Sequence, residues 1–114
     1  MKIEHLQVKN FNFIGINSQT EGDVSFFGKT YHYGKHTGTI TQEDSEVLCI
    51  QSESELLGNL TATNASIFGK VTGDILAHEQ VEVFSGAQIQ GTIKSKNIKI
   101  HPGAIVLGEL ETLN

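Results

Sequence analysis

The chain has 114 residues, which is enough for one small domain. It contains 12 glycines, one proline and no tryptophan, so it bends often and has few large side chains to fill a central core. The formal net charge is −5, and all eight positive residues are lysines. Because arginine makes the usual bidentate contacts to phosphates and bases, this composition argues against a nucleic-acid partner.

Cys49 is the only cysteine. A single cysteine excludes an internal disulfide and a cysteine-based zinc site of the usual kind, and it favours a reducing compartment such as a bacterial cytoplasm. No apolar run approaches the length that crosses a bilayer. We therefore expect a cytoplasmic protein, with contact at the inner face of the cell membrane as an alternative.

Six of the glycines precede a polar and then an aliphatic residue, and these tripeptides divide the chain into repeats. In chain order they are Gly22-Asp23-Val24, Gly38-Thr39-Ile40, Gly58-Asn59-Leu60, Gly73-Asp74-Ile75, Gly91-Thr92-Ile93 and Gly108-Glu109-Leu110. Successive tripeptides lie roughly 15 to 20 residues apart, which is shorter than any helical repeat. The apolar residues between them alternate at a period of two, which indicates strands.

The first two repeats are the least regular. The first carries Asn12, Ser18 and Thr20 at inward positions, as expected of an end repeat. In the second, His32 and His36 match Ile67 and Val71 of the fourth repeat. Tyr31 and Tyr33 stand beside them, so either the histidines or the tyrosines point inward. The histidines are the best candidates for a metal pair or a catalytic base, but no helix is expected here to bring them onto one face, and a structural role is favoured.

The third repeat begins after residues 41–47, which we expect to form an exposed acidic corner. It supplies inward residues in the register of the fifth repeat: Leu48, Ile50, Ser54, Leu56 and Leu60. Cys49 lies between two of these, so we expect it to point outward. The nearest charges in sequence are acidic, which predicts an inert thiol.

The last two repeats align without a gap, at one constant offset. Val81, Val83, Gly86, Ala87, Ile89, Gly91 and Ile93 match Ile98, Ile100, Gly103, Ala104, Val106, Gly108 and Leu110. Phe68 and Phe84 precede corner glycines and predict an aromatic stack along one edge. Lys94, Lys96 and Lys99 form a basic cluster that we interpret as a solvated edge, with weak contact to anionic lipid or glycan as the alternative.

A unit of roughly 15 to 20 residues is too short to bury an apolar face alone or to make a strand-helix-strand crossover. Each repeat therefore predicts one coil of an all-β parallel β-helix. Six coils at about 4.8 Å would make a rod of about 29 Å.

The ordered series of motifs resembles the bactofilins, the polymer-forming cytoskeletal proteins of bacteria. The residues that carry the resemblance are Phe13-Ile14-Gly15-Ile16, Thr20-Glu21-Gly22-Asp23-Val24, Phe27-Gly28-Lys29, Gly38-Thr39-Ile40, Gly58-Asn59-Leu60-Thr61-Ala62 and Gly73-Asp74-Ile75. The resemblance covers residues 11–110, between a short N-terminal tail (1–10) and a C-terminal tail (111–114). It implies a right-handed, roughly triangular parallel β-helix that assembles end to end into non-polar filaments without nucleotide and often scaffolds envelope morphogenesis.

The leading hypothesis is a structural protein whose main partner is itself, with a cell-envelope or peptidoglycan-modifying protein as a further partner. No phosphate-binding loop, nucleophile elbow or paired carboxylates are present, so we expect no enzyme activity, cofactor or metal. The rival hypotheses are a left-handed β-helix acyltransferase, whose six-residue period fits poorly, and a non-polymerising adaptor.

We place the polymer interface on the two terminal coils. No capping helix is visible in the sequence, and an uncovered coil end templates further strand pairing. The predicted interface residues are Phe11, Phe13 and Ile14 at the N-terminal end and Val106, Leu107, Leu110 and Leu113 at the C-terminal end.

Overall fold

The computed structural model describes residues 2–8, 12–14 and 19–113, with side chains for residues 19–113. All regular elements in these ranges are β-strands. They are β1 (Lys2–Val8), β2 (Asn12–Ile14), β3 (Gln19–Phe26), β4 (Thr30–His32), β5 (Lys35–Gln42), β6 (Val47–Ile50), β7 (Glu55–Ile67), β8 (Lys70–Val83), β9 (Gln88–Ile100) and β10 (Ile105–Thr112).

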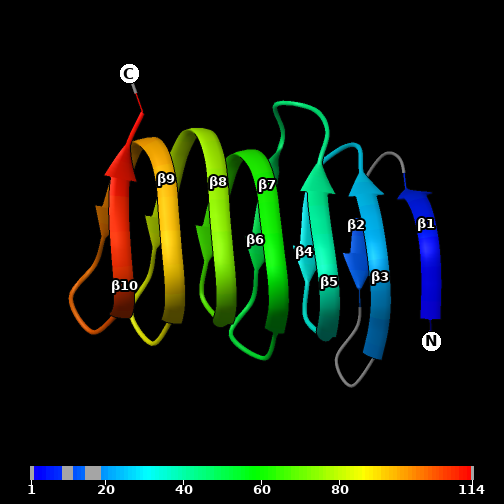
Figure 1. The fold of residues 1–114 in the computed structure, drawn as a ribbon, viewed down its shortest axis with the longest axis horizontal. Coiled ribbons are helices and arrows are strands. Elements are labelled where there is room, and N and C mark those ends of the chain that lie inside the picture. Colours follow the sequence, from blue (N-terminus) through cyan, green and yellow to red (C-terminus); the bar gives the residue numbers. More distant parts are fainter. Residues whose placement is uncertain (1, 9–11, 15–18, 114) are drawn as a thin grey trace.

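The strands stack in parallel along the long axis of the molecule, with the N- and C-terminal strands at opposite ends (Figure 1). One row runs through β1, β3, β5 and β7, and a second runs through β2, β4, β6 and β7. In each of β7, β8 and β9 a single long strand contributes to both rows, because it continues around the corner. The expected parallel β-solenoid of about six coils is confirmed, and its Cα extents are 32 × 27 × 20 Å.

The strand register confirms the repeat alignment. Ile89 pairs with Val106, and Ile93 pairs with Leu110, at the offset that the sequence alignment predicts. One interior column contains His36, Leu56, Val71 and Ile89, each no more than 1% exposed. The core is therefore a set of stacked aliphatic columns only one side chain wide in each coil.

The repeated glycines form the corner at which each long strand bends. Gly73 has a φ of +136°, a conformation that side-chain-bearing residues rarely adopt. A Cβ at this position would overlap the carbonyl oxygen of Gly58 in the preceding coil. Glycine is required here both for the backbone conformation and for the close approach of neighbouring coils.

The open question of phase in the second repeat is settled in favour of the histidines. His32 and His36 are each 1% exposed and occupy the interior, whereas Tyr31 and Tyr33 are half-buried. The histidines point inward because the strand register places His32 opposite Ile50.

Both terminal segments that the sequence analysis treated as tails contain strand residues. Lys2–Val8 forms β1 and pairs with β3. Glu111 and Thr112 extend β10 along β9, and the Leu113 N–H donates to the Ser95 carbonyl at 2.8 Å. The solenoid therefore reaches further toward each end than the glycine repeats indicate.

The acidic corner after β5 is more ordered than its composition indicates. Glu43 and Glu46 are exposed, but Asp44 is half-buried. One Asp44 oxygen accepts the Gly28 N–H at 2.6 Å, and the other accepts the Gln42 side-chain N–H at 2.7 Å. Burial acts to raise the pKa of Asp44, but these hydrogen bonds outweigh it and lower the pKa. The hydrogen bond from Gly28 to Asp44 therefore links the corner to the preceding coil.

Candidate polymer interface

Large exposed hydrophobic side chains gather in the last coil. Within residues 19–113 they are Ile100, Ile105, Leu107 and Leu110, with exposed fractions of 40%, 50%, 61% and 51%. In the inner coils the inward aliphatic residues are buried, and outward ones such as Leu57 and Leu76 are half-buried. The C-terminal end is therefore an apolar surface on an otherwise polar rod.

These exposed side chains are of two kinds. Leu110 and Ile100 continue the interior columns of Ile93 and Val83, and they are exposed because no described coil follows them. Ile105 and Leu107 alternate with Val106, which packs against the core. Their register partners in the preceding coil are polar, Gln88 and Gln90. The last coil thus presents apolar residues on its end and also on its rim.

The backbone of β10 adds hydrogen-bonding capacity to this end. Within the described chain β10 pairs with β9 alone, so its other edge carries backbone N–H and C=O groups without a strand partner. Such an edge is a template for pairing with another chain.

At the N-terminal end, the described strands that pair on one side only are β1 and β2. Phe13 and Ile14 lie in β2, where their backbones pair with Tyr31 and His32. The side chains of Phe13 and Ile14 lie outside the described part of the structure, as does Phe11 entirely. Their expected role in the interface stays a prediction.

The structure adds two exposed apolar residues, Ile100 and Ile105, to those predicted for the C-terminal interface. Ile100 could have been found, because the constant offset of the last two repeats matches it with Val83. Ile105 had a weaker signal, since it is aliphatic at a position that holds Gln88, Lys70 and Glu55 in earlier coils. Of the four predicted C-terminal residues, Leu107 and Leu110 are exposed and Val106 and Leu113 are half-buried.

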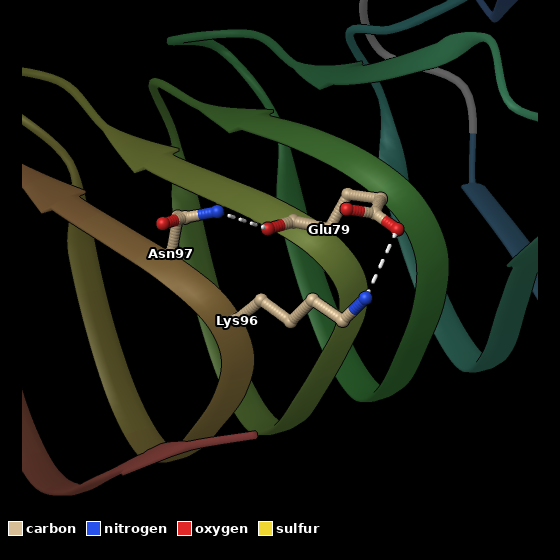
Figure 2. A network of polar contacts seen from close by, with 3 residues as sticks. All are labelled: Glu79, Lys96 and Asn97. Carbon is tan, nitrogen blue, oxygen red and sulfur yellow. Dashed lines mark hydrogen bonds and ion pairs between the residues drawn. The ribbon is translucent and has the colours of Figure 1, made fainter. Parts of the chain in front are cut away.

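The sides of the rod carry charge pairs that join neighbouring coils. Each lysine of the predicted basic cluster has an acidic neighbour: Lys94 lies 3.7 Å from Glu111, Lys96 lies 3.5 Å from Glu79, and Lys99 lies 4.0 Å from Glu82. Figure 2 shows Lys96 reaching Glu79, whose backbone carbonyl also accepts the Asn97 side-chain N–H at 3.2 Å. The paired charges leave little net positive field with which to attract an anionic surface.

An aromatic ladder runs toward the C-terminal end. The Phe68 and Phe84 rings stack with centroids 4.1 Å apart, which confirms the predicted stack. His101 extends it, with its ring 4.8 Å from Phe84 and its Nε2 2.6 Å from a Glu82 oxygen. Both partners of His101 lie in the preceding coil, so its place in the ladder cannot be read from its neighbours in sequence.

The two interior histidines are held by specific hydrogen bonds. Ser54 donates its hydroxyl to the Gly34 carbonyl at 3.0 Å, so it accepts a hydrogen bond from His32 Nδ1 at 2.6 Å. His32 Nε2 is buried and has no partner. Protonation would create a buried N–H without an acceptor, and burial, with a smaller effect from His36, lowers the pKa of His32 to about 4.

His36 has partners at both ring nitrogens. Its Nε2 donates to the Gly22 carbonyl at 2.8 Å, and its Nδ1 lies 2.6 Å from the Thr20 hydroxyl. Burial lowers its pKa, and the bond to Gly22 opposes this effect. Both histidines therefore act as neutral packing groups near pH 7.

The remaining candidate for chemistry is Cys49, which is 7% exposed although it lies outside the core cluster. Its register partners Tyr31 and Ser66 flank it on the adjacent coils. Burial raises the pKa of the thiol, opposed by the charge of Lys29, which the sequence analysis did not associate with it. A protonated, covered thiol is a poor nucleophile. Residues 19–113 contain no group of three or more metal-ligating side chains.

A search of the described residues finds no helix that is long and apolar enough to cross a membrane.

The class of protein that these elements define is a parallel β-solenoid, whose last described coil carries exposed aliphatic side chains and a strand edge without a partner in the described chain. The family model described as "Bactofilin: Polymer-forming cytoskeletal" matches residues 12–111. The chain therefore belongs to the bactofilin family, a structural cytoskeletal family. It is similar to Bactofilin BacO of Myxococcus xanthus (strain DK1622), with 28% identity over 98 residues that cover 86% of this chain and 76% of the relative. No solved structure matches the chain.

Proposed function

We propose that this chain is the subunit of a cytoplasmic filament that grows end to end without nucleotide or metal and scaffolds cell-envelope or cell-shape machinery. The observation that carries the proposal is the last coil, which combines an unpaired strand edge with four exposed aliphatic side chains. Membership of a polymer-forming family supports self-association. Contact with the inner face of the membrane, through an envelope protein, belongs to the same proposal.

The energetics favour contact through the end of the rod over contact through its sides. Complete burial of an aliphatic side chain stabilises by roughly 1.5–3 kcal/mol, so covering the exposed half of Leu110 contributes about 1 kcal/mol. Each backbone hydrogen bond added along β10 contributes about 0.5–1.5 kcal/mol. An exposed ion pair formed between the charged sides of two rods would contribute only about 0–1 kcal/mol.

The test is negative-stain electron microscopy of the purified protein in EDTA and without nucleotide. We expect filaments from the parent chain, and short oligomers or monomers from Leu110→Glu and Leu107→Glu, because a carboxylate at the junction is desolvated and faces its own copy. Thr72→Glu is the matched control, since Thr72 lies in the same outer column as Leu107 but in an inner coil.

Filaments that persist in both end variants would refute growth through the last coil. Filaments that dissolve in EDTA would refute assembly without metal. Circular dichroism of each variant verifies that the β-structure is intact.

The non-polymerising adaptor is the second candidate, and one observation favours it. A shallow groove crosses the outer face of the inner coils, lined by Thr39, Asn59, Leu60, Thr61, Asp74, Ile75, Leu76, Thr92 and Lys94. An adaptor would remain monomeric at high concentration in the same microscopy. His32 and His36, the best candidates for a catalytic base in the sequence, are both buried, which disfavours the acyltransferase hypothesis.

A further inference from the structure

The two ends of the rod differ in how their strand edges are finished. At the C-terminal end, β10 repeats the corner of β9, with Gly108 paired to Gly91. At the N-terminal end, β1 lies along the outer edge of β3, with Leu6 paired to Val24 and Val8 paired to Phe26 (Figure 1). Without β1, the edge of β3 would be as open as that of β10.

β1 is not a further regular coil. Lys2 pairs with Glu21 and His5 pairs with Asp23, so a step of three residues in β1 faces a step of two in β3. The irregularity falls opposite Gly22, the first corner glycine of the row.

The cause is the composition of the segment. Lys2–Val8 has the sequence KIEHLQV and contains no glycine. In the regular coils glycine pairs with glycine at the corner, as Gly22 does with Gly38, and a Cβ there would overlap the neighbouring backbone. A strand without glycine can follow β3 only by bulging away at this point.

A bulged edge is a poor template for further strands. A glycine-cornered coil from another molecule could not stack regularly on β1, whereas it would match the exposed edge of β3 once β1 had left. The need for a glycine at the corner also determines which strand can replace β1 on β3. A peptide strand without a corner glycine would need the same bulge as β1. The edges that fit β3 are therefore those of a second copy of this chain.

We propose that β1 is a detachable cap that covers the N-terminal edge of the solenoid, and that a second subunit adds to this end by displacing it. The proposal rests on the end-to-end assembly proposed above and concerns its regulation. In the described chain β1 pairs with β3 alone, whereas an inner strand such as β8 pairs on both sides. Displacement exchanges one set of backbone hydrogen bonds for another, so protein concentration decides between the cap and the neighbour.

The test compares the critical concentration for assembly, measured by sedimentation, in the parent and in a variant that lacks residues 2–8. We expect the critical concentration to fall by about tenfold, which corresponds to about 1.4 kcal/mol of capping contact removed. An unchanged critical concentration would overturn the cap.

A second variant tests the cap even if the deletion variant fails to fold. The double substitution His5→Cys and Asp23→Cys places two cysteines at paired backbone positions. Oxidation should lock β1 in place and raise the critical concentration at least tenfold, and reduction of the same sample should restore the parent value. The parent chain under the same oxidant is the control, since its single cysteine, Cys49, is buried.

Equal assembly of the locked and reduced forms would overturn the proposal even if the deletion variant aggregates. If the parent chain assembles but neither the deletion nor the disulfide changes the critical concentration, the cap is refuted and the filament is not. Failure of the parent and both variants to assemble at any concentration would refute the filament as well.

Discussion

Replacement of His32 by isoleucine should remove much of the acid sensitivity of the fold. Isoleucine is the residue at this position in the next two coils, Ile50 and Ile67, so the column can accept it. Ser54 keeps its hydrogen bond to Gly34, and the unpaired Nε2 is eliminated. At pH 7 we expect the stability of His32→Ile to lie within about 1.5 kcal/mol of the parent.

The magnitude follows from the pKa of His32, which falls from 6.5 to about 4 on folding. Between these two values the unfolded chain binds the proton that the folded chain excludes, so stability is lost as the pH falls from about 6.5 to about 4. At about 1.4 kcal/mol per pH unit the full loss is about 3 kcal/mol, of which about 2 kcal/mol is incurred by pH 5. The isoleucine variant should not suffer this loss.

The assay is urea unfolding followed by circular dichroism at pH 7, 6 and 5, on dilute protein. The difference in unfolding free energy between variant and parent should grow by about 2 kcal/mol from pH 7 to pH 5. His36 and the carboxylates remain in both proteins and largely cancel in this difference. Parallel pH profiles for the parent and His32→Ile would refute the assignment of a neutral, unpaired imidazole.

Three further substitutions test the core and the corner. Ile89→Asp should prevent folding, because it places an unpaired carboxylate between Val71 and Val106, and recovery of soluble protein with a native β-spectrum would contradict the inward column. Gly73→Ala should cost more than about 3 kcal/mol, since backbone strain and overlap with Gly58 combine. Gly86→Ala, where φ is +90° and the added Cβ has open space, should cost only about 1–2 kcal/mol, and equal thermal shifts for the two variants would show that close coil approach does not matter.

The repeat register could be read from the sequence because glycine and aliphatic residues recur at fixed offsets. Gly91 and Gly108, or Ile93 and Leu110, needed only alignment to be placed side by side. The phase of His32 and His36 could not be read in the same way, because tyrosine and histidine are both amphipathic and alternate with one another. The buried partner groups Ser54 and Gly22 decide it, and they come from other coils.

Most of the features that could not be predicted from the sequence depend on contacts between coils. Cys49 has acidic neighbours in sequence, but Lys29, from the preceding coil, contributes the charge that acts on its pKa. The contacts of His101 with Phe84 and Glu82 likewise come from the preceding coil. β1 was missed because it has no corner glycine, which was the feature that revealed every other coil.

The direction of the backbone hydrogen bonds has a mechanical consequence. They join successive coils, so they run along the 32 Å axis on which the strands stack (Figure 1). A pulling force along this axis acts on all the bonds between two coils together, and the rod yields at whichever junction is weakest. Among residues 19–113, the buried polar side chains lie mostly in the early coils, at Ser25, Thr30, His32, His36, Gln42 and Ser54, with Ser95 the one in the later coils. Under tension the early junctions should separate first, while the aliphatic junctions between β7 and β10 hold.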